Sequence, residues 1–555
     1  MLKRIYFIIT LLAAVVIDIT AQPAAVKNAA KSVFQLTTYD KDGTEIMTSH
    51  GVFVGANGEA ISQLKPFIGA VKAVVTDTKG NQMNVTRILG ANDIYDVVRF
   101  SVDGKTTPAA TAQAATQGSK VWLVGYADKN PVMTAATVGN VEKFMEKYSY
   151  YIFKLTPPDK TNSCPFINEQ GQVIGLMQPS TTTFDTYATD ARYIADLQVS
   201  GMSVNDANMK KIGIPTAIPA DKTQALLALM MAEQSNDSLK RAAAANDFIE
   251  KFPTEVDGYA SRAQMFADVN NFDNAAKDME TAIKKVDVKD EAHFRYSKLI
   301  YFKEVYKSNL PYKPWSLDKA LDEVKAAHDI NPQPFYKHLE AQIRFTKGEY
   351  QTAYDMFTEL LKTPIRNGEL FFEASRCKLM MKAPETEIIA LLDSAIANTD
   401  TLHFQAAAPY FYARAQANES LKKYRDAVFD YTRYEFLMNR QVGADFYYIR
   451  EQAELKGKLF KQALNDITVA IVLNPDEPMY VAEKASVELK VNMLDEAQKT
   501  AEVCVKRWPE YPDGFMLLGL ARIHKNQKAE GLANLEKAKQ LGSEQAQSLI
   551  DKYSK

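Results

Sequence analysis

Histidine and cysteine are scarce in this chain of 555 residues, which contains six of the former and three of the latter. Only one histidine, His50, precedes position 293. The cysteines, Cys164, Cys377 and Cys504, lie far apart, so we expect neither a disulfide framework nor a zinc site built on cysteine. A histidine metal site is equally unexpected, and no cofactor is implied.

The chain also lacks a charge excess of either sign. It has 66 Lys and Arg against 68 Asp and Glu, and 66 − 68 gives a net charge of −2. No strong field therefore exists to attract nucleic acid, and no phosphate-binding glycine loop or basic stripe is present. The 46% hydrophobic content is typical of globular protein. At about 150 residues per domain, the length corresponds to three or four domain-sized units.

Long apolar runs are absent except near the N-terminus, where two basic residues precede an apolar stretch at 5–17. This pattern is typical of a secretory signal peptide spanning residues 1–21, with a cut near Ala21-Gln22. An uncleaved anchor is the alternative, because Ile19 is larger than the residue preferred there. No later run reaches about 18 apolar residues, so we expect a secreted or periplasmic protein with no transmembrane segment after signal cleavage.

Glycine divides the rest of the chain into two halves, with 15 of the 24 glycines before position 222. The first half carries short β-branched and aromatic runs separated by turn signals such as Asn57-Gly58, which predict an antiparallel barrel or sandwich. Examples of these runs are residues 32–38, 51–54, 71–76, 121–124 and 172–176. From about Thr223 long helical segments take over, and residues 213–219, with two prolines, predict a stiff linker.

The helical half repeats. One unit orders an aromatic residue, a turn glycine, a second aromatic residue, small residues and a proline, at Tyr447, Gly457, Phe460, Ala463, Ala470 and Pro475. This order and spacing match the 34-residue tetratricopeptide repeat. Further units echo it around Tyr259, Tyr350, Tyr424, Leu494 and Phe515, and weaker units near 222–253, 291–332 and 369–397 bring the number to about nine. The array resembles tetratricopeptide-repeat (TPR) proteins, which implies an all-α solenoid whose concave face binds a protein or peptide.

Three segments of the β half have a recognisable order: residues 49–62, 89–100 and 162–175. They resemble the segments that carry the catalytic His, Asp and Ser of HtrA-type, trypsin-like serine proteases, in the chymotrypsin order. The resemblance implies a chymotrypsin-like double β-barrel over residues 28–204.

Matched residue by residue, the resemblance implies a degenerate triad. Lys65 occupies the position of the catalytic histidine, Asp96 that of the aspartate and Asn162 that of the nucleophile. A serine hydroxyl needs an imidazole or similar base to attack, so two of three members are missing. Lys160, Ser163 and Cys164 replace glycines of the nucleophile loop, which makes the oxyanion hole doubtful.

Fallback nucleophiles remain. A one-residue shift makes Ser163 the nucleophile, or Cys164 acts as a thiolate whose pKa is depressed by Lys65 or Lys160. The simpler interpretation is that Cys164 is a buried small residue. His50 lies about fifteen residues before the histidine position, too early to replace the base.

The sequence therefore predicts a signal peptide at 1–21, an inactive trypsin-like domain at 28–204, a linker at 205–221 and a TPR superhelix at 222–555. We expect a non-catalytic scaffold that binds protein or peptide. An active protease using Ser163 or Cys164 is the first alternative, and an envelope glycan-binding protein is the second.

Overall fold

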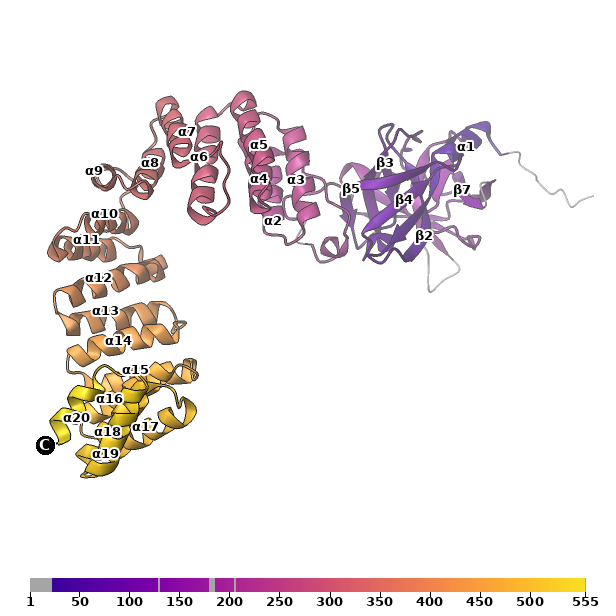
Figure 1. Cartoon of the computed structure of the whole chain (residues 1–555). Coiled ribbons are helices and arrows are strands. Elements are labelled where there is room, and N and C mark those ends of the chain that lie inside the picture. The colour runs from indigo at the N-terminus through magenta and orange to yellow at the C-terminus, as the bar shows by residue number, and fades with distance from the viewer. Residues whose placement is uncertain (1–21, 128–129, 179–184, 204–205, 555) are drawn as a thin grey trace, which may run out of the picture. The chain divides into compact units, whose positions relative to one another are not determined.

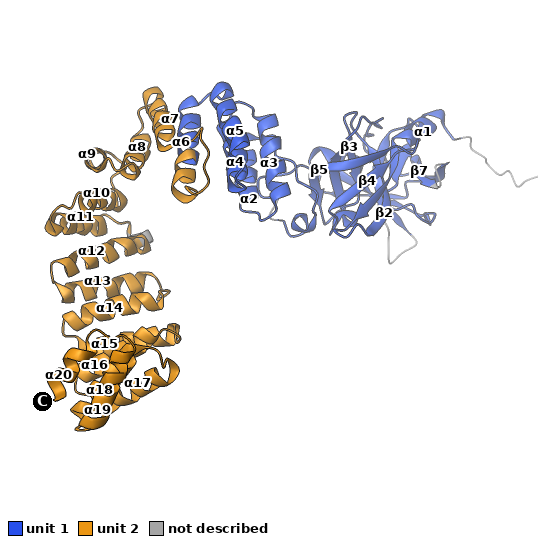
Figure 2. Cartoon of the chain, viewed as in Figure 1, with its two compact units in different colours: residues 1–299 blue, residues 300–555 orange. Residues whose placement is uncertain are grey.

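The computed structural model of the chain describes residues 22–127, 130–178, 185–203 and 206–554. The signal peptide expected at 1–21 lies outside the described residues. The chain divides into two compact units, Met1–Leu299 and Ile300–Lys555, which Figure 2 colours separately. In the described ranges, no helix is both long and apolar enough to cross a membrane.

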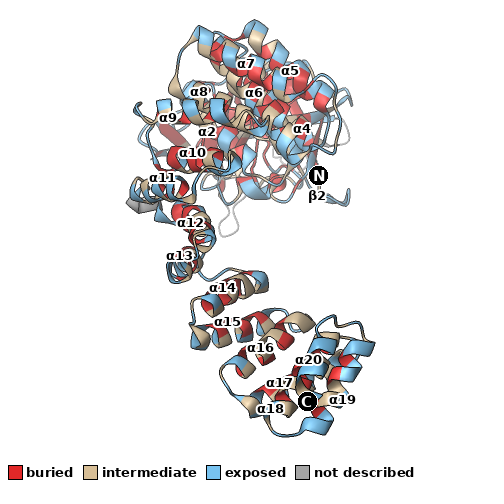
Figure 3. Cartoon of the chain, turned by 60° about the vertical axis from the view of Figure 1, so that its left-hand side comes forward, coloured by how far each residue is buried: buried red, intermediate tan, exposed pale blue. Residues whose placement is uncertain are grey.

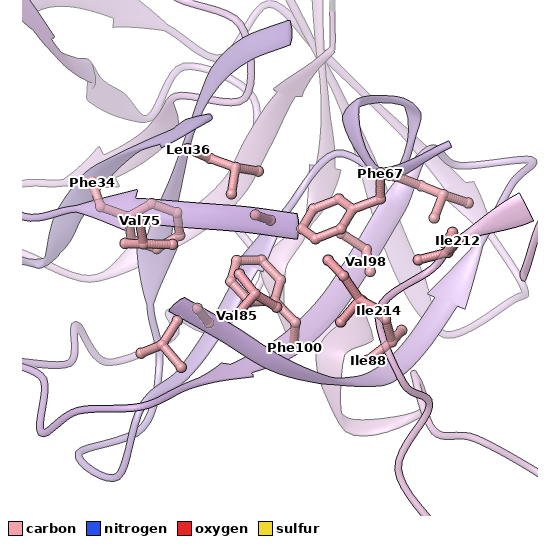
Figure 4. Close-up of a cluster of buried hydrophobic side chains, with 14 of the residues drawn as sticks. Phe34, Leu36, Phe67, Val75, Val85, Ile88, Val98, Phe100, Ile212 and Ile214 are labelled. Atoms are coloured by element: carbon pink, nitrogen blue, oxygen red, sulfur yellow. The ribbon is translucent and has the colours of Figure 1, made fainter. Parts of the chain in front are cut away.

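Unit 1 begins with a short helix and a closed six-stranded β-barrel (Figure 1). The elements are α1 (Ala24–Ala29), η1 (Ala30–Ser32), β1 (Val33–Tyr39), β2 (Glu45–Phe53), β3 (Glu59–Ser62), η2 (Lys65–Phe67), β4 (Lys72–Thr76), β5 (Gln82–Asn92) and β6 (Val97–Val102). Hydrogen-bonded neighbours run β1-β2-β3-β6-β5-β4 and return to β1. Alternate residues of β6 face the core, where Phe100 meets Phe34 and Phe67 at ring-centroid distances of 6.0 and 5.2 Å (Figure 4).

The following strands form a seven-stranded sheet, where the resemblance implied a second barrel. They are β7 (Lys120–Ala127), β8 (Asn130–Thr137), β9 (Asn140–Phe144), β10 (Tyr148–Phe153), β11 (Pro165–Asn168), β12 (Val173–Gln178) and β13 (Thr186–Asp190), ordered β8-β7-β11-β12-β13-β10-β9. The sheet is open because β8 pairs with β7 and β9 with β10, while β8 and β9 form no ladder with each other. The sequence thus predicted the β class and the barrel, and the hydrogen bonding of the second half differs from that expectation.

The segment interpreted as a linker, residues 205–221, belongs in its described part to the β region. It includes η5 (Met209–Lys211) and follows η3 (Ala191–Ala195). Ile212 and Ile214 are 1% and 3% exposed and complete the barrel core (Figure 4). The amide of Ile88 donates to the carbonyl of Pro215. The alternation of apolar residues here is a strand-like signal rather than that of a free connection.

Replacing Ile214 with valine tests this placement. Loss of one buried methylene is expected to lower the free energy of unfolding of unit 1 by about 1 kcal/mol. The matched control is Ile46→Val on β2, where the side chain is 37% exposed and no measurable change is expected. Urea unfolding of the full chain measures both, and equal effects at the two positions would contradict a core role for Ile214.

Helices follow the barrel within unit 1: α2 (Lys222–Glu233), α3 (Ser238–Lys251), α4 (Val256–Asp268), α5 (Phe272–Lys285) and α6 (Lys289–Tyr306), the last running into unit 2. Asp221 and Asp237 cap α2 and α3 by accepting hydrogen bonds from backbone amides of the first turn. The β region and these helices are joined by a bidentate pair, in which Arg87 Nε and Nη2 both donate to Asp247 at 2.9 Å.

All regular secondary structure in the described residues of unit 2 is helical. Its elements are α7 (Leu317–Ile330), α8 (Pro334–Thr346), α9 (Tyr350–Leu360), α10 (Gly368–Met380), α11 (Glu385–Ala397), η6 (Thr401–Ala407), α12 (Ala408–Ser420), α13 (Tyr424–Leu437), α14 (Ala444–Lys456), α15 (Phe460–Leu473), α16 (Pro478–Lys490), α17 (Leu494–Arg507), α18 (Pro512–His524), α19 (Lys528–Gln540) and α20 (Ala546–Ser554). Each α-helix packs against the next. Figure 3 shows the buried residues of α14 to α18 on the sides that face neighbouring helices.

The turn at Gly457 differs in detail from the sequence expectation. Gly457 is right-handed, with φ −79°, and it is Lys458 that takes the left-handed conformation, with φ 58°. The same left-handed conformation occurs in other turns of unit 2, at Lys382, Lys422, Asn492 and Asn526. The left-handed residue ends the first helix of each pair, and a residue other than glycine occupies it despite the steric cost.

A buried ion pair recurs in three helix pairs. Arg262, Arg414 and Arg450 each bond bidentately to an aspartate sixteen residues later, at Asp278, Asp430 and Asp466. The three aspartates are 2–7% exposed. Because a buried carboxylate requires a partner, each pair fixes how the two helices of its unit meet.

Candidate functional site

Lys65 and Asp96, matched to the histidine and aspartate of a protease triad, lie together in the structure. Lys65 starts η2 just after β3, and Asp96 lies in the loop between β5 and β6 with φ 48°. Asp96 Oδ1 accepts a hydrogen bond from the Lys65 amide at 2.9 Å, and Oδ2 lies 3.8 Å from Lys65 Nζ. The Lys65 side chain is 76% exposed, so this ion pair adds little to stability.

The loop matched to the nucleophile keeps a special backbone without the glycines of the resembled family. Lys160 and Ser163 have φ values of 62° and 65°, in the left-handed region that glycine favours. Asn162 between them is exposed, and its carbonyl accepts a hydrogen bond from the amide of His50 at 3.0 Å. Lys160 and Ser163 therefore adopt the left-handed conformation without being glycine, at a steric cost.

The fallback nucleophiles, Ser163 and Cys164, are both fully buried. No described residue hydrogen-bonds to Ser163 Oγ, so no base is in place to activate it. Cys164 lies in an apolar cluster with Leu123, Phe166 and Met177, and burial raises the pKa of its thiol far above the usual range. Neither Lys65 nor Lys160 acts as a thiolate partner in this arrangement.

The Cys164 thiol should accordingly be inert in the native protein. In a Cys377→Ala, Cys504→Ala background, we expect Ellman's reagent to react with Cys164 at least about a hundredfold more slowly in buffer than in urea, since the thiolate is the reactive form. Rates measured by absorbance check this. Rapid native labelling would instead place Cys164 in an open, activated site.

His50 lies against the nucleophile loop, although not as a triad base. It is 3% exposed on β2, and its carbonyl accepts a hydrogen bond from Ser62 Oγ at 2.6 Å. Burial lowers the pKa of its imidazole, which is therefore neutral at pH 7, with backbone groups of Tyr126 and Asn162 beside it. Within the described ranges no carboxylate orients the ring. His50, which precedes the Asn57-Gly58 turn, therefore contacts the loop matched to the nucleophile, and the sequence did not predict this contact.

Sequence analysis missed the residues that hold the Asp96 loop. The ring of Tyr95 packs on Phe144 and Tyr193 at centroid distances of 4.3 and 5.9 Å. The Gln178 side-chain amide donates to the carbonyl of Tyr95, and also to Thr189 Oγ1 at 2.7 Å. Tyr95, Phe144 and Tyr193 lie on separate segments far apart in the sequence, so no local pattern predicts this cluster.

At the three positions matched to a triad, the structure has an ion pair between Lys65 and Asp96 and the exposed side chain of Asn162. Lys65, Asp96 and Asn162 are linked through β2 and β3, because the backbone of His50 bonds both Asn162 and Ser62. No group of three His, Cys, Asp or Glu side chains within the described part of the chain is placed to hold a metal ion.

Comparison with known protein families and with curated proteins finds no match. Among solved structures, the chain is similar to the HtrA-type protease AlgW with tripeptide, at 16% identity and a TM-score of 0.28, over 31% of this chain and 60% of that one. It is also similar to the inactive form of the Rv3671c protease, at 15% identity and a TM-score of 0.27, over 32% and 91% of the two chains. The chain thus spans about three fifths of the length of the AlgW chain.

Proposed function

We propose that this protein is a secreted or periplasmic, non-catalytic scaffold that binds protein or peptide. It combines an inactive trypsin-like domain, related to the chymotrypsin-like double barrel, with a TPR solenoid that carries the binding face. The alternative of an active protease using Ser163 or Cys164 is disfavoured by the full burial of both side chains.

The pairing of Lys65 with Asp96 carries the non-catalytic part of the proposal. A carboxylate in a triad orients an imidazole that accepts the nucleophile's proton. Here Asp96 instead accepts a hydrogen bond from the backbone amide of Lys65 and forms an ion pair with its side chain. The matched position in the nucleophile loop is the exposed Asn162, whose amide is no nucleophile. The closed barrel and the left-handed loop fit a protease-like scaffold that has lost its chemistry.

The helices of unit 2 support the binding part. Helices that each pack on the next are typical of a solenoid, whose side-by-side elements offer an extended surface to a partner. The buried Arg–Asp pairs, repeated at one spacing, are consistent with repeats of one ancestral helix pair. Recognition in this arrangement requires no cofactor.

Binding and cleavage should be measured in one sample. We expect the full chain, mixed with peptides from unfolded casein, to bind a subset by fluorescence anisotropy and to return them intact by mass spectrometry. Hydrogen exchange should then show added protection among α7 to α18 rather than around Lys65. Cleaved peptides, or protection confined to the β region, would contradict the proposal.

A further inference from the structure

His50 carries a buried imidazole that the proposed function does not use. It is 3% exposed on β2, and its ring lies beside backbone groups of Tyr126 on β7 and of Asn162 in the nucleophile loop. No described residue meets either ring nitrogen with hydrogen-bond geometry. The site therefore suits the neutral ring, because a charge placed there would lose its hydration without gaining a partner.

The strands around His50 present uncharged side chains to it. Gln35 of β1 lies opposite His50 in the sheet, and Gln63, the residue after β3, is 5% exposed. On β7, burial raises the pKa of Tyr126, which therefore stays neutral. None of these three side chains can balance the charge of an imidazolium.

The nucleophile loop does not supply a counter-charge to the ring either. Burial raises the pKa of the Cys164 thiol far above its usual range, so this group is neutral. Asp159 and Lys160 are charged, but both are exposed. Burial is the largest influence on the pKa of His50 and lowers it, and the other influences come from backbone groups. Protonation of His50 in the closed structure is therefore opposed by burial, with no charged side chain among the described residues to offset it.

The nucleophile loop is attached at His50 and is strained. The His50 amide donates a hydrogen bond to the carbonyl of Asn162 at 3.0 Å. Lys160 and Ser163, on either side of Asn162, have left-handed φ values of 62° and 65°, which are costly for residues other than glycine. Such a segment opens at a lower cost than the core of its domain, so a penalty at His50 acts first on this loop.

We propose that protonation of His50 opens the nucleophile loop, which at neutral pH covers Ser163 and Cys164. In the open form the ring is in water and has its usual pKa of 6.5, whereas in the closed form burial lowers this pKa. Below about pH 6.5 the open form therefore binds a proton that the closed form does not, and the closed form loses stability as pH falls. The proposal goes beyond partner binding and does not depend on it.

The thiol of Cys164 reports on the opening of the loop. The full chain carrying Cys377→Ala and Cys504→Ala is labelled with dithiodipyridine, which reacts with thiols at acidic as well as neutral pH. At each pH the rate in urea divided by the rate in buffer gives the protection of Cys164. We expect this protection to fall about tenfold between pH 7 and pH 5, because opening takes up one proton. A protection that is the same at both pH values would overturn the proposal.

Variants distinguish His50 from other titrating groups. His50→Gln should remove the dependence on pH, because glutamine does not ionise, whereas His524→Gln, at an exposed histidine of α18, should leave it unchanged. A loop loosened by the glutamine itself would show lower protection equally at both pH values. A dependence that persists in His50→Gln would contradict the assignment to this residue.

A cysteine in the barrel core separates opening of the loop from unfolding of the domain. Ala73 on β4 is 1% exposed, and Ala73→Cys in a chain whose three natural cysteines are replaced by alanine should stay equally protected at pH 7 and pH 5. A tenfold fall there as well would mean that the whole domain unfolds in acid, which would overturn the proposal. If His50→Gln fails to fold, the comparison of Cys164 with this position still decides.

Discussion

Replacing Arg450 with alanine is expected to lower the free energy of unfolding of unit 2 by about 3–5 kcal/mol. Arg450 is 6% exposed, and it donates to Asp466 at 2.6 Å and to Glu435 at 2.7 Å. Its guanidinium also lies over the ring of Phe446 at 5.3 Å. Removing it leaves the buried carboxylate of Asp466 and the half-buried carboxylate of Glu435 without their cation, and this unpaired charge dominates the loss.

Two control variants distinguish the effect of losing a buried charge from the effect of losing an exposed one. Arg507→Ala breaks an exposed pair with Asp476 and should cost less than about 0.5 kcal/mol. The double variant Arg450→Met, Asp466→Leu should recover most of the loss, since apolar residues can replace a buried pair. Urea unfolding followed by circular dichroism measures all three. A full loss in the double variant would mean that the size of the side chain, rather than the unpaired charge, is what matters.

The second large effect is a loss of stability with rising pH, caused by two glutamates of α14. Glu451 and Glu454 are 0% and 3% exposed, and no described residue hydrogen-bonds to Glu451 Oε1 or Glu454 Oε2. Burial raises the pKa of both carboxyls to about 8. The charged groups that act on them are Glu435, Arg450, Asp466, Glu483 and Lys490.

The native state keeps protons that the unfolded chain releases above the usual glutamate pKa of 4.5. The free energy of unfolding therefore falls as pH rises from about 4.5 to about 8, and between pH 5 and pH 9 we expect a fall of about 4 kcal/mol for each of the two carboxyls. Glu451→Gln with Glu454→Gln should remove most of this slope, because glutamine does not ionise.

Urea unfolding at the two pH values measures the slope. The matched control is Glu530→Gln on α19, an exposed site where the slope of the unchanged protein should persist. An equal slope in the double glutamine variant would show that other groups titrate, and would contradict burial as the cause.

Local patterns predicted the classes of structure well. The short β-branched runs became strands, because strand alternation and turn residues are local signals. The nearness of Lys65 and Asp96 was implied by the resemblance to HtrA-type proteases rather than by any local pattern. The open second sheet was not predictable, since whether β8 meets β9 depends on how the strands curl, not on their composition.

Two further features of the structure are visible as sequence patterns, namely the buried segment after η5 and the Arg–Asp pairs. The alternation at Ile212 and Ile214 predicts a core-facing extended segment, whereas Pro215 and Pro219, which follow it, favoured a linker. The recurring Arg–Asp spacing of sixteen residues is visible when the helical units are aligned with one another. His50 could not be placed from sequence, because its contact with the nucleophile loop joins residues more than a hundred positions apart.

Peptide hydrolysis tests the central claim most directly. Purified full-length protein incubated with unfolded casein and a peptide library should yield no product above buffer by mass spectrometry. Ser163→Ala and Cys164→Ala should leave that result unchanged, because both side chains are buried and no described residue hydrogen-bonds to Ser163 Oγ. Turnover by the natural protein that either substitution abolishes would contradict the account and restore a protease with an unusual nucleophile.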